Sequence, residues 1–218
     1  MKIVDKDIAV QIGASYTIGN YILPSFHSKM KETLGNEIII TIDRSAELIQ
    51  NLADKRIDIA LIETPIMHDH VFYREWLDDE VIMFSNVPLP KTVKPIDMQK
   101  YSWVVREAES HTRKIAMDAL EHVGIDCSTF FDIQNVLTDS TAIKQTVLKA
   151  DKESDKPTAS VVSKFVIEDE IKAKILFDTK IKGLNLGRKL YIAYLKENKH
   201  DAHISNVVSF LMKQKVTV

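Results

Sequence analysis

Cysteine and unbalanced charge are both nearly absent from this chain. Its 218 residues include a single cysteine, Cys127, so an intramolecular disulfide is excluded and a reducing compartment is indicated. The 29 lysines and arginines nearly balance the 31 aspartates and glutamates. The resulting net charge of −2 gives no indication of a nucleic-acid-binding surface on this chain.

Long apolar runs are missing as well. Residues 1–6 are charged and lack the apolar core of a secretory signal. No apolar run reaches the length that a membrane span needs. The composition is otherwise that of an ordinary globular protein, 45% hydrophobic and 28% charged. We therefore expect a cytoplasmic protein that does not associate with a membrane.

Recognisable catalytic motifs are also lacking. The sequence has no Gly-x-Ser-x-Gly, no P-loop and no Gly-x-Gly-x-x-Gly. His68 and His70 form a His-x-His pair, but a zinc site needs a third and a fourth ligand, and none is identifiable. Cys127 is expected as a small surface or core residue rather than a nucleophile, and the acidic run 78–80 as a solvated turn. We expect no enzymatic activity, no metal and no cofactor.

Strand-like and helix-like segments alternate along the chain, which indicates an α/β architecture with a largely parallel sheet. Strands are expected at 8–12, 37–42, 57–62, 80–85, 103–105, 160–162 and 189–195, and in a region that begins at 130–132. Helices are expected at 18–33, 45–55, 112–123, 140–149, 165–171 and 204–213. The proline-containing stretch 87–95 marks a boundary, and the charged stretch 151–157 is expected to be a loop.

Two hydroxyl side chains follow the first expected strand directly. The apolar, β-branched run ends at Gly13, Ser15 and Thr17 come next, and a helix-like pattern begins at Ile18. A strand, a short turn and a helix in this order direct backbone N–H groups and side-chain oxygens at one spot. Such a spot holds a small anion or the carboxylate of a larger ligand. The alternative is a plain helix cap with no ligand.

Ser45 is expected to cap the helix 45–55, and hydroxyl side chains also precede two further expected helices, in the turns 110–112 and 138–140. Ligands of open α/β sheets lie beyond the carboxyl ends of the strands, where such turns gather. Several helix N-termini that face one cleft would favour a small anion, although each cap alone can be purely structural. Arg44 and Arg113 could bind a carboxylate or sulfate through two hydrogen bonds, or could be solvated surface groups.

The first strand, the Ser15-x-Thr17 turn and a helix with Tyr21-Ile22-Leu23-Pro24 together resemble the start of the effector-binding domain of LysR-type transcriptional regulators. Asp58-Ile59-Ala60-Leu61 is typical of the same family, and Thr138-Asp139-Ser140-Thr141-Ala142-Ile143-Lys144 is similar to the family's second-lobe turn before an Ala-Ile-Lys helix. The resemblance covers nearly the whole chain. It fails after the Ile-Lys helix, where members carry Ala-Gly-x-Gly-Ile and this chain has the charged stretch 151–157.

The resemblance implies a type-2 periplasmic-binding-protein fold, in which two α/β lobes are joined by two crossover strands, here near 80–85 and 189–195. One lobe would comprise residues 1–80 and 190–218, and the other residues 81–189. A small anionic effector would bind between the lobes. The residues that the resemblance assigns to effector binding are Ser15, Thr17, Ser110, Thr112, Arg113 and Thr138. Arg44 and Thr64 are further candidates, because they lie at the ends of strands in the first lobe.

The resemblance also implies partners. DNA would be bound only by an N-terminal winged helix-turn-helix that is absent from this chain. The segments 37–42 and 45–55 are similar to the family's dimerisation elements, so we expect a homodimer, and a tetramer of the full-length regulator. The effector would be a small molecule, similar to the sulfur-related anions that some members sense. The alternative is the solute-binding protein of a transporter, which shares the fold, and an enzyme on this fold comes third.

Overall fold

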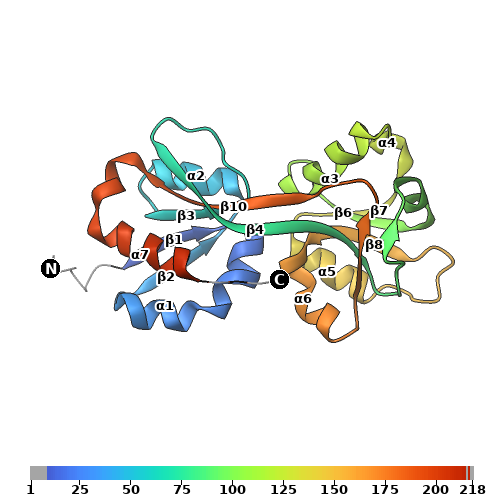
Figure 1. Ribbon diagram of the computed structural model, residues 1–218, viewed down its shortest axis with the longest axis horizontal. Coiled ribbons are helices and arrows are strands. Elements are labelled where there is room, and N and C mark those ends of the chain that lie inside the picture. Colours follow the sequence, from blue (N-terminus) through green and yellow to red (C-terminus); the bar gives the residue numbers. More distant parts are fainter. Residues whose placement is uncertain (1–8, 215, 217–218) are drawn as a thin grey trace. The chain divides into compact units, whose positions relative to one another are not determined.

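The computed structural model describes residues 9–214 and residue 216, and these fall into two compact units (Figure 1). The segment Asp79–Arg188 forms one of them, here called the middle unit. The described residues that precede and follow this segment form the other, here called the terminal unit. The long strands β4 (Val71–Ser85) and β10 (Gly187–Leu195) carry the chain from one unit to the other.

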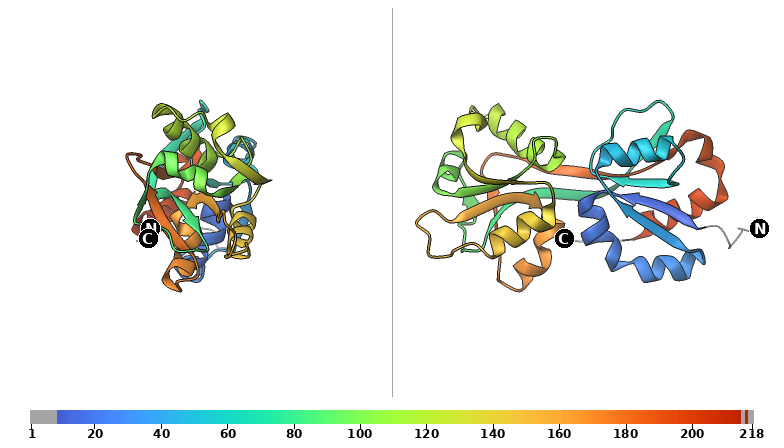
Figure 2. Two further views of the ribbon diagram at one scale, coloured as in Figure 1. Left: turned by 90° about the vertical axis from the view of Figure 1, so that its right-hand side faces the viewer. Right: turned by 180° about the vertical axis from the view of Figure 1, so that it is seen from behind.

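The terminal unit is built on a mixed sheet. Strand β1 (Val10–Ala14) lies between β2 (Ile38–Ile42) and β3 (Ile59–Ile62) and is parallel to both, whereas β10 pairs antiparallel with β3. Helix α2 (Ser45–Ala53) covers one face of this sheet, and α1 (His27–Leu34) and α7 (Ala202–Lys213) cover the other (Figures 1 and 2). The apolar face of α2 buries Leu48 and Leu52 against β3, so one part of the core of this unit lies between α2 and the sheet.

The segment expected as one helix over 18–33 is interrupted. It begins as a π-helical turn (Ile18–Ile22), continues as a 3₁₀ turn (Leu23–Ser25) and becomes α-helical only in α1. Pro24 explains the break, because proline has no N–H to donate to the preceding turn. The four residues expected at core spacing are nevertheless all buried: Ile18, Ile22, Phe26 and Met30. Helix α1 ends at Leu34 and is capped by Gly35, whose φ of 71° is a left-handed conformation that glycine adopts readily.

The middle unit repeats the same construction. Strand β6 (Ser102–Arg106) is parallel to β7 (Asp132–Leu137) and β8 (Thr158–Ser163), while the second half of β4 is antiparallel to β8 and to β9 (Phe177–Ile181). Helix α3 (His111–His122) covers one face, and α5 (Ser140–Leu148) and α6 (Lys164–Lys172) cover the other (Figure 1). Trp103 is fully buried in the core cluster that the sheet forms with Ala116 and Leu120 of α3.

Shorter elements complete the middle unit and the C-terminal end of the terminal unit. Strand β5 (Thr92–Val93) pairs with β9, and a 3₁₀ turn (Pro95–Lys100) leads into β6. Helix α4 (Cys127–Phe130) precedes β7, and a 3₁₀ turn (Lys196–His200) joins β10 to α7. The stretch 151–157 is a loop between α5 and β8, as expected. None of the described helices combines the length and the apolar character needed to cross a membrane.

The expectation of a solvated turn at 78–80 is wrong. These residues lie inside β4, which is much longer than the strand expected at 80–85. Asp79 is buried there because the guanidinium of Arg188 neutralises it, with Nε 2.7 Å from Oδ2. A buried carboxylate needs such a partner, since an isolated buried charge is very unfavourable. The partner lies 109 residues away in the sequence, so a local pattern could not predict the burial of Asp79.

Candidate functional site

In the terminal unit, the residues expected at the site follow three neighbouring parallel strands. Ser15 follows β1, Arg44 follows β2 and Thr64 follows β3, so all three lie at the carboxyl edge of the β2-β1-β3 sheet. Ser15 and Thr17 are buried, whereas Arg44 is exposed and Thr64 is half-buried. The structure therefore brings the terminal-unit candidates to one edge, with the two hydroxyls of the first turn inside it.

Ser15 presents an unsatisfied polar atom at this edge. Its backbone N–H donates to the Leu61 carbonyl at 2.8 Å, and its own carbonyl accepts the Gly19 N–H at 2.7 Å. These bonds fix the turn on the end of β3. The residue Ser15 is only 3% exposed, and its Oγ has no hydrogen-bond partner among the described residues. Buried hydroxyls are nearly always hydrogen-bonded, so this oxygen is suited to a bound water or ligand.

Glu63 was not expected at this edge. It follows β3 directly, and its Oε1 accepts the Thr17 N–H at 3.3 Å. Its own N–H lies 3.4 Å from the Ser45 Oγ, so Ser45 contacts Glu63. The expectation that Ser45 caps its helix is wrong, because Ser45 is the first residue of α2 and Arg44 occupies the cap position. The position of Glu63, directly after a buried strand, was a signal that could have identified it.

In the middle unit, the residues expected at the second turn gather at the start of α3. Ser110 caps this helix, with its Oγ accepting the Arg113 N–H at 3.5 Å. Arg113 donates from Nη1 to the Arg106 carbonyl at 2.8 Å, which draws its side chain back over the end of β6. Thr112 is buried, and its Oγ1 accepts a hydrogen bond from Arg188 Nη1 at 3.2 Å. Arg113 is therefore a half-buried, engaged side chain rather than a solvated one.

A buried ion pair, also missed in the sequence, supports this turn. Arg106 donates to both carboxylate oxygens of Glu107, at 2.8 and 3.0 Å, and from Nη1 to the Ser140 Oγ at 2.8 Å. Arg106 ends β6 and Ser140 begins α5, so the pair joins two elements at the same edge of the sheet. Two charged residues directly after the apolar run 103–105 were the signal for this pair in the sequence.

Thr138 differs from the other candidates. It is exposed, in a bend between β7 and α5. The cap of α5 is the carboxylate of Asp139, whose Oδ1 accepts the Ala142 N–H at 2.8 Å, and not a hydroxyl as expected. The turn 138–140 thus contributes one exposed hydroxyl, that of Thr138, while the Ser140 hydroxyl accepts a hydrogen bond from Arg106.

The single cysteine is not activated as a nucleophile. Burial raises the pKa of the Cys127 thiol to about 11, and the nearby carboxylates of Glu121 and Asp126 raise it further in the same direction. This thiol is therefore protonated at neutral pH and is a poor nucleophile. Within the described residues, no three His, Cys, Asp or Glu side chains are grouped so that they could hold a metal ion. The hydroxyls, N–H groups and ion pairs described above are groups that can bind a ligand through hydrogen bonds.

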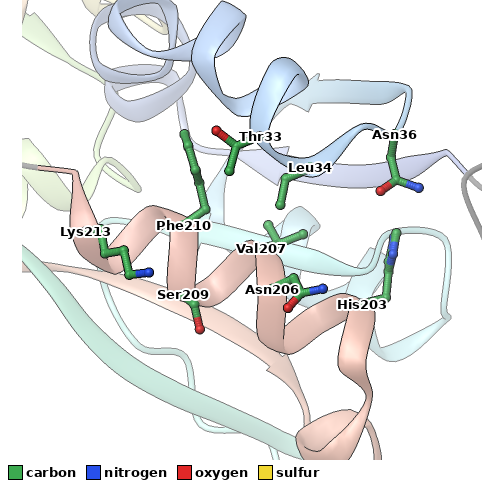
Figure 3. A pocket seen from close by; sticks show the side chains of 9 residues that line it. All are labelled: Thr33, Leu34, Asn36, His203, Asn206, Val207, Ser209, Phe210 and Lys213. Carbon is green, nitrogen blue, oxygen red and sulfur yellow. The ribbon is translucent and has the colours of Figure 1, made fainter. Parts of the chain in front are cut away.

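The terminal unit also contains a pocket away from these residues. It has a volume of about 330 Å³ and lies between α1 and α7 (Figure 3). Leu34, Val207 and Phe210 supply its apolar surface, and the His203 Nε2 in its wall is buried without a hydrogen-bond partner among the described residues. None of the residues expected at the effector site lines this pocket.

Comparison with known sequences identifies the family. The family described as LysR substrate binding domain matches residues 9–215. The transcriptional regulator YeiE of Escherichia coli K12, itself described as uncharacterised, is 28% identical over 204 residues, which cover 92% of this chain and 65% of YeiE. The regulator CysL of Bacillus subtilis is 25% identical over 217 residues, 94% of this chain and 69% of CysL. The chain thus spans about two thirds of the length of these relatives.

Solved structures share the fold. The regulatory domain of CcmR from Synechocystis, solved with 2-PG, superposes with a TM-score of 0.77 at 16% identity, covering 94% of this chain and 95% of that one. The effector-binding domain of QuiR, solved with shikimate, gives a TM-score of 0.76 at 15% identity, covering 94% and 96%.

These similarities confirm the predicted type-2 periplasmic-binding-protein fold, and the relatives favour a regulator over the transporter alternative. With its family pattern matched from residue 9 to residue 215, the chain belongs to the LysR substrate-binding-domain family.

Proposed function

We propose that this domain senses a small anion and thereby controls DNA binding by a helix-turn-helix that is not in this chain. The regulator acts in the cytoplasm of a bacterium, and the domain itself catalyses no reaction. Both effector-bound neighbours support a small-molecule ligand, and shikimate, bound by QuiR, is a carboxylate. The mechanism is a difference in effector affinity between two arrangements of the domain, because a ligand shifts an equilibrium only by that difference.

The observation that carries this proposal is the buried Oγ of Ser15 at the carboxyl edge of β1, for which the described part of the chain offers no hydrogen-bond partner. Thr17 lies in the same turn, and Arg44 and Thr64 lie at the same edge. In the middle unit, Ser110, Thr112, Arg113 and Thr138 would contribute the second set of contacts. The 12-residue helix α3 begins there, and its N-terminal dipole favours negative charge.

A homodimer is part of the proposal. Strand β2 is an edge of its sheet, and Ile39 and Ile42 on it are 41% and 37% exposed. Exposed apolar side chains on an edge strand are a surface that a second chain can cover. We propose that β2 and α2 form this contact, in an antiparallel pair of subunits with two-fold symmetry.

A thermal-shift screen of inorganic sulfate, other sulfur metabolites, amino acids and aromatic acids tests the ligand class. Calorimetric titration of the best anion then compares wild-type protein with the double variant Ser15→Ala, Thr17→Ala. Loss of hydrogen bonds to a charged ligand is expected to weaken binding by about 1–3 kcal/mol. Ser205→Ala, an exposed serine on α7, is the matched control and should bind as wild type does. Unchanged affinity in the double variant, or no anion that binds, would overturn the proposal.

A further inference from the structure

The chain enters and leaves the middle unit through a buried ion pair. Asp79 is the first residue of this unit and Arg188 the last. Their side chains are 0% and 4% exposed, and Arg188 Nε lies 2.7 Å from Asp79 Oδ2. The neighbouring residues, Asp78 and Lys189, form a second pair at 2.5 Å, but this one is largely exposed to solvent. The two strands that connect the units, β4 and β10, are therefore tied together at the boundary by one buried contact and one exposed contact.

Asp79 is itself held in place from a third element. The Ser163 hydroxyl, at the end of β8, donates to Asp79 Oδ1 at 2.7 Å. Both carboxylate oxygens thus accept a hydrogen bond, one from Ser163 and one from Arg188. A guanidinium is planar and presents its N–H groups in a fixed fork, so the contact at Nε also sets the directions in which the other two nitrogens donate.

One of these directions leads to the proposed effector site. Arg188 Nη1 donates to Thr112 Oγ1 at 3.2 Å, and Thr112 lies in the first turn of α3. A hydroxyl that accepts a hydrogen bond from a cation becomes a stronger donor through its own proton, because chains of hydrogen bonds polarise one another. Thr112 is thus oriented and polarised by a residue that does not belong to α3.

We propose that Arg188, held by Asp79, is a positioning residue for Thr112, and that it couples the effector to β4 and β10. This inference rests on the proposed function, because it assumes that Thr112 contacts an anion. When the Thr112 hydroxyl donates a hydrogen bond to the effector, the strength of the Thr112–Arg188 hydrogen bond changes. The Arg188–Asp79 ion pair, which joins β10 to β4, changes with it. The strands β4 and β10 therefore respond to the ligand, and the side chain of Arg188 transmits the effect to them.

A double-mutant cycle with inorganic sulfate as the probe tests the positioning role. The paired change Asp79→Asn, Arg188→Gln removes both charges together, so no unpaired charge remains buried. It is expected to weaken sulfate binding by about tenfold when Thr112 is present, and to have no further effect in a Thr112→Val background. A purely structural role would weaken binding by the same factor in both backgrounds, and that result would overturn the inference. The control Lys189→Gln removes only the exposed pair and should leave affinity unchanged.

Hydrogen exchange tests the coupling without altering the ion pair. Saturating sulfate is expected to slow exchange of the β4 and β10 amides beside Asp79 and Arg188 in wild-type protein, and not in Thr112→Val at a concentration that also saturates it. Equal protection in both proteins would overturn the coupling. If sulfate binds and Thr112→Val weakens it, the proposed site stands whatever the cycle shows. If sulfate fails to bind wild-type protein, the anion site fails, and this inference falls with it.

Discussion

Glu63 places a carboxylate at the position where an anion would approach the Thr17 N–H, and the substitution Glu63→Gln tests what that carboxylate does. The amide oxygen of glutamine can still accept the Thr17 N–H that Glu63 Oε1 now accepts at 3.3 Å, so the local fold should persist. Only the negative charge is lost. If the ligand is an anion that shares this edge with Ser15, its affinity should rise, because the charge that opposes it has gone.

The size of the effect follows from Coulomb's law. An anion at the Thr17 N–H would have its charge about 5 Å from the Glu63 carboxylate. The repulsion at that distance is about 1 kcal/mol per unit of ligand charge in bulk water and about 3 kcal/mol at an effective dielectric constant of 20. We therefore expect binding of a singly charged anion to tighten by roughly 5- to 150-fold, and binding of doubly charged sulfate by about the square of that factor. Added salt should reduce the difference between the two proteins, since part of the edge is open to solvent.

Calorimetric titration with sulfate at fixed ionic strength measures this change. Glu47→Gln is the matched control, because Glu47 is exposed in the first turn of α2 and its replacement alters net charge equally. The control should bind sulfate as wild type does. Affinity that is unchanged in Glu63→Gln would place the anion elsewhere. Affinity that falls would mean that the Glu63 carboxylate is needed to hold the turn that binds sulfate, and would contradict the expected repulsion.

The remaining predictions concern stability, reactivity, association and DNA. Arg106→Met should destabilise the protein by about 3–5 kcal/mol in thermal or urea unfolding, because it breaks the buried pair with Glu107; an unaltered unfolding midpoint would contradict this. At pH 8 iodoacetamide should alkylate Cys127 about a hundredfold more slowly in the folded protein than in urea, since the thiol pKa rises from 9.0 to about 11; equal rates would show that the thiol is not desolvated. Ile39→Asp on β2 should raise the dimer dissociation constant at least about tenfold in sedimentation experiments, and a wild-type protein that stays monomeric at high concentration would refute the dimer. This chain alone should not retard DNA in a low-salt gel-shift assay, because its net charge of −2 gives little drive for phosphate neutralisation; a sequence-specific shift would refute the assignment of DNA binding to another segment.

Local patterns predicted most of the elements. The helices α2, α5 and α7 have one apolar face, and the strands β1, β3 and β6 are short apolar runs, so periodicity alone locates them to within a few residues. The first half of β4 was missed because exposed and half-buried side chains, several of them charged, occupy it. Strand β9 was missed because the charged side chains of Asp178 and Lys180 interrupt its apolar pattern. Such strands are defined by their neighbours rather than by their own composition.

In the candidate site too, the features that are local in the sequence were predicted, and the contacts between distant residues were not. The hydroxyls of Ser15 and Ser110 were predicted because each follows a strand and precedes a helix, a relation that is local in sequence. The acidic and basic residues that hold the turns were not, since Arg188 meets Asp79 across 109 residues and Thr112 across 76. Glu63 meets Thr17 across 46 residues. Pairings of this kind form only when the sheet has folded. The sequence shows that the charged residues are present, but it does not show which of them pair.

The division of the chain into a continuous and a discontinuous unit has a consequence for synthesis. The middle unit is one uninterrupted segment, complete once Arg188 has left the ribosome. The terminal unit still lacks β10 and α7 at that moment, and β3 presents an open edge until Tyr191, Ile192 and Ala193 arrive to pair with it. Segments that close over a long sequence separation fold late. A nascent chain therefore carries a finished middle unit beside an unfinished terminal one. Messages truncated shortly after the codon for Arg188 would yield a product with an exposed strand edge, which is a target for aggregation and for proteolysis.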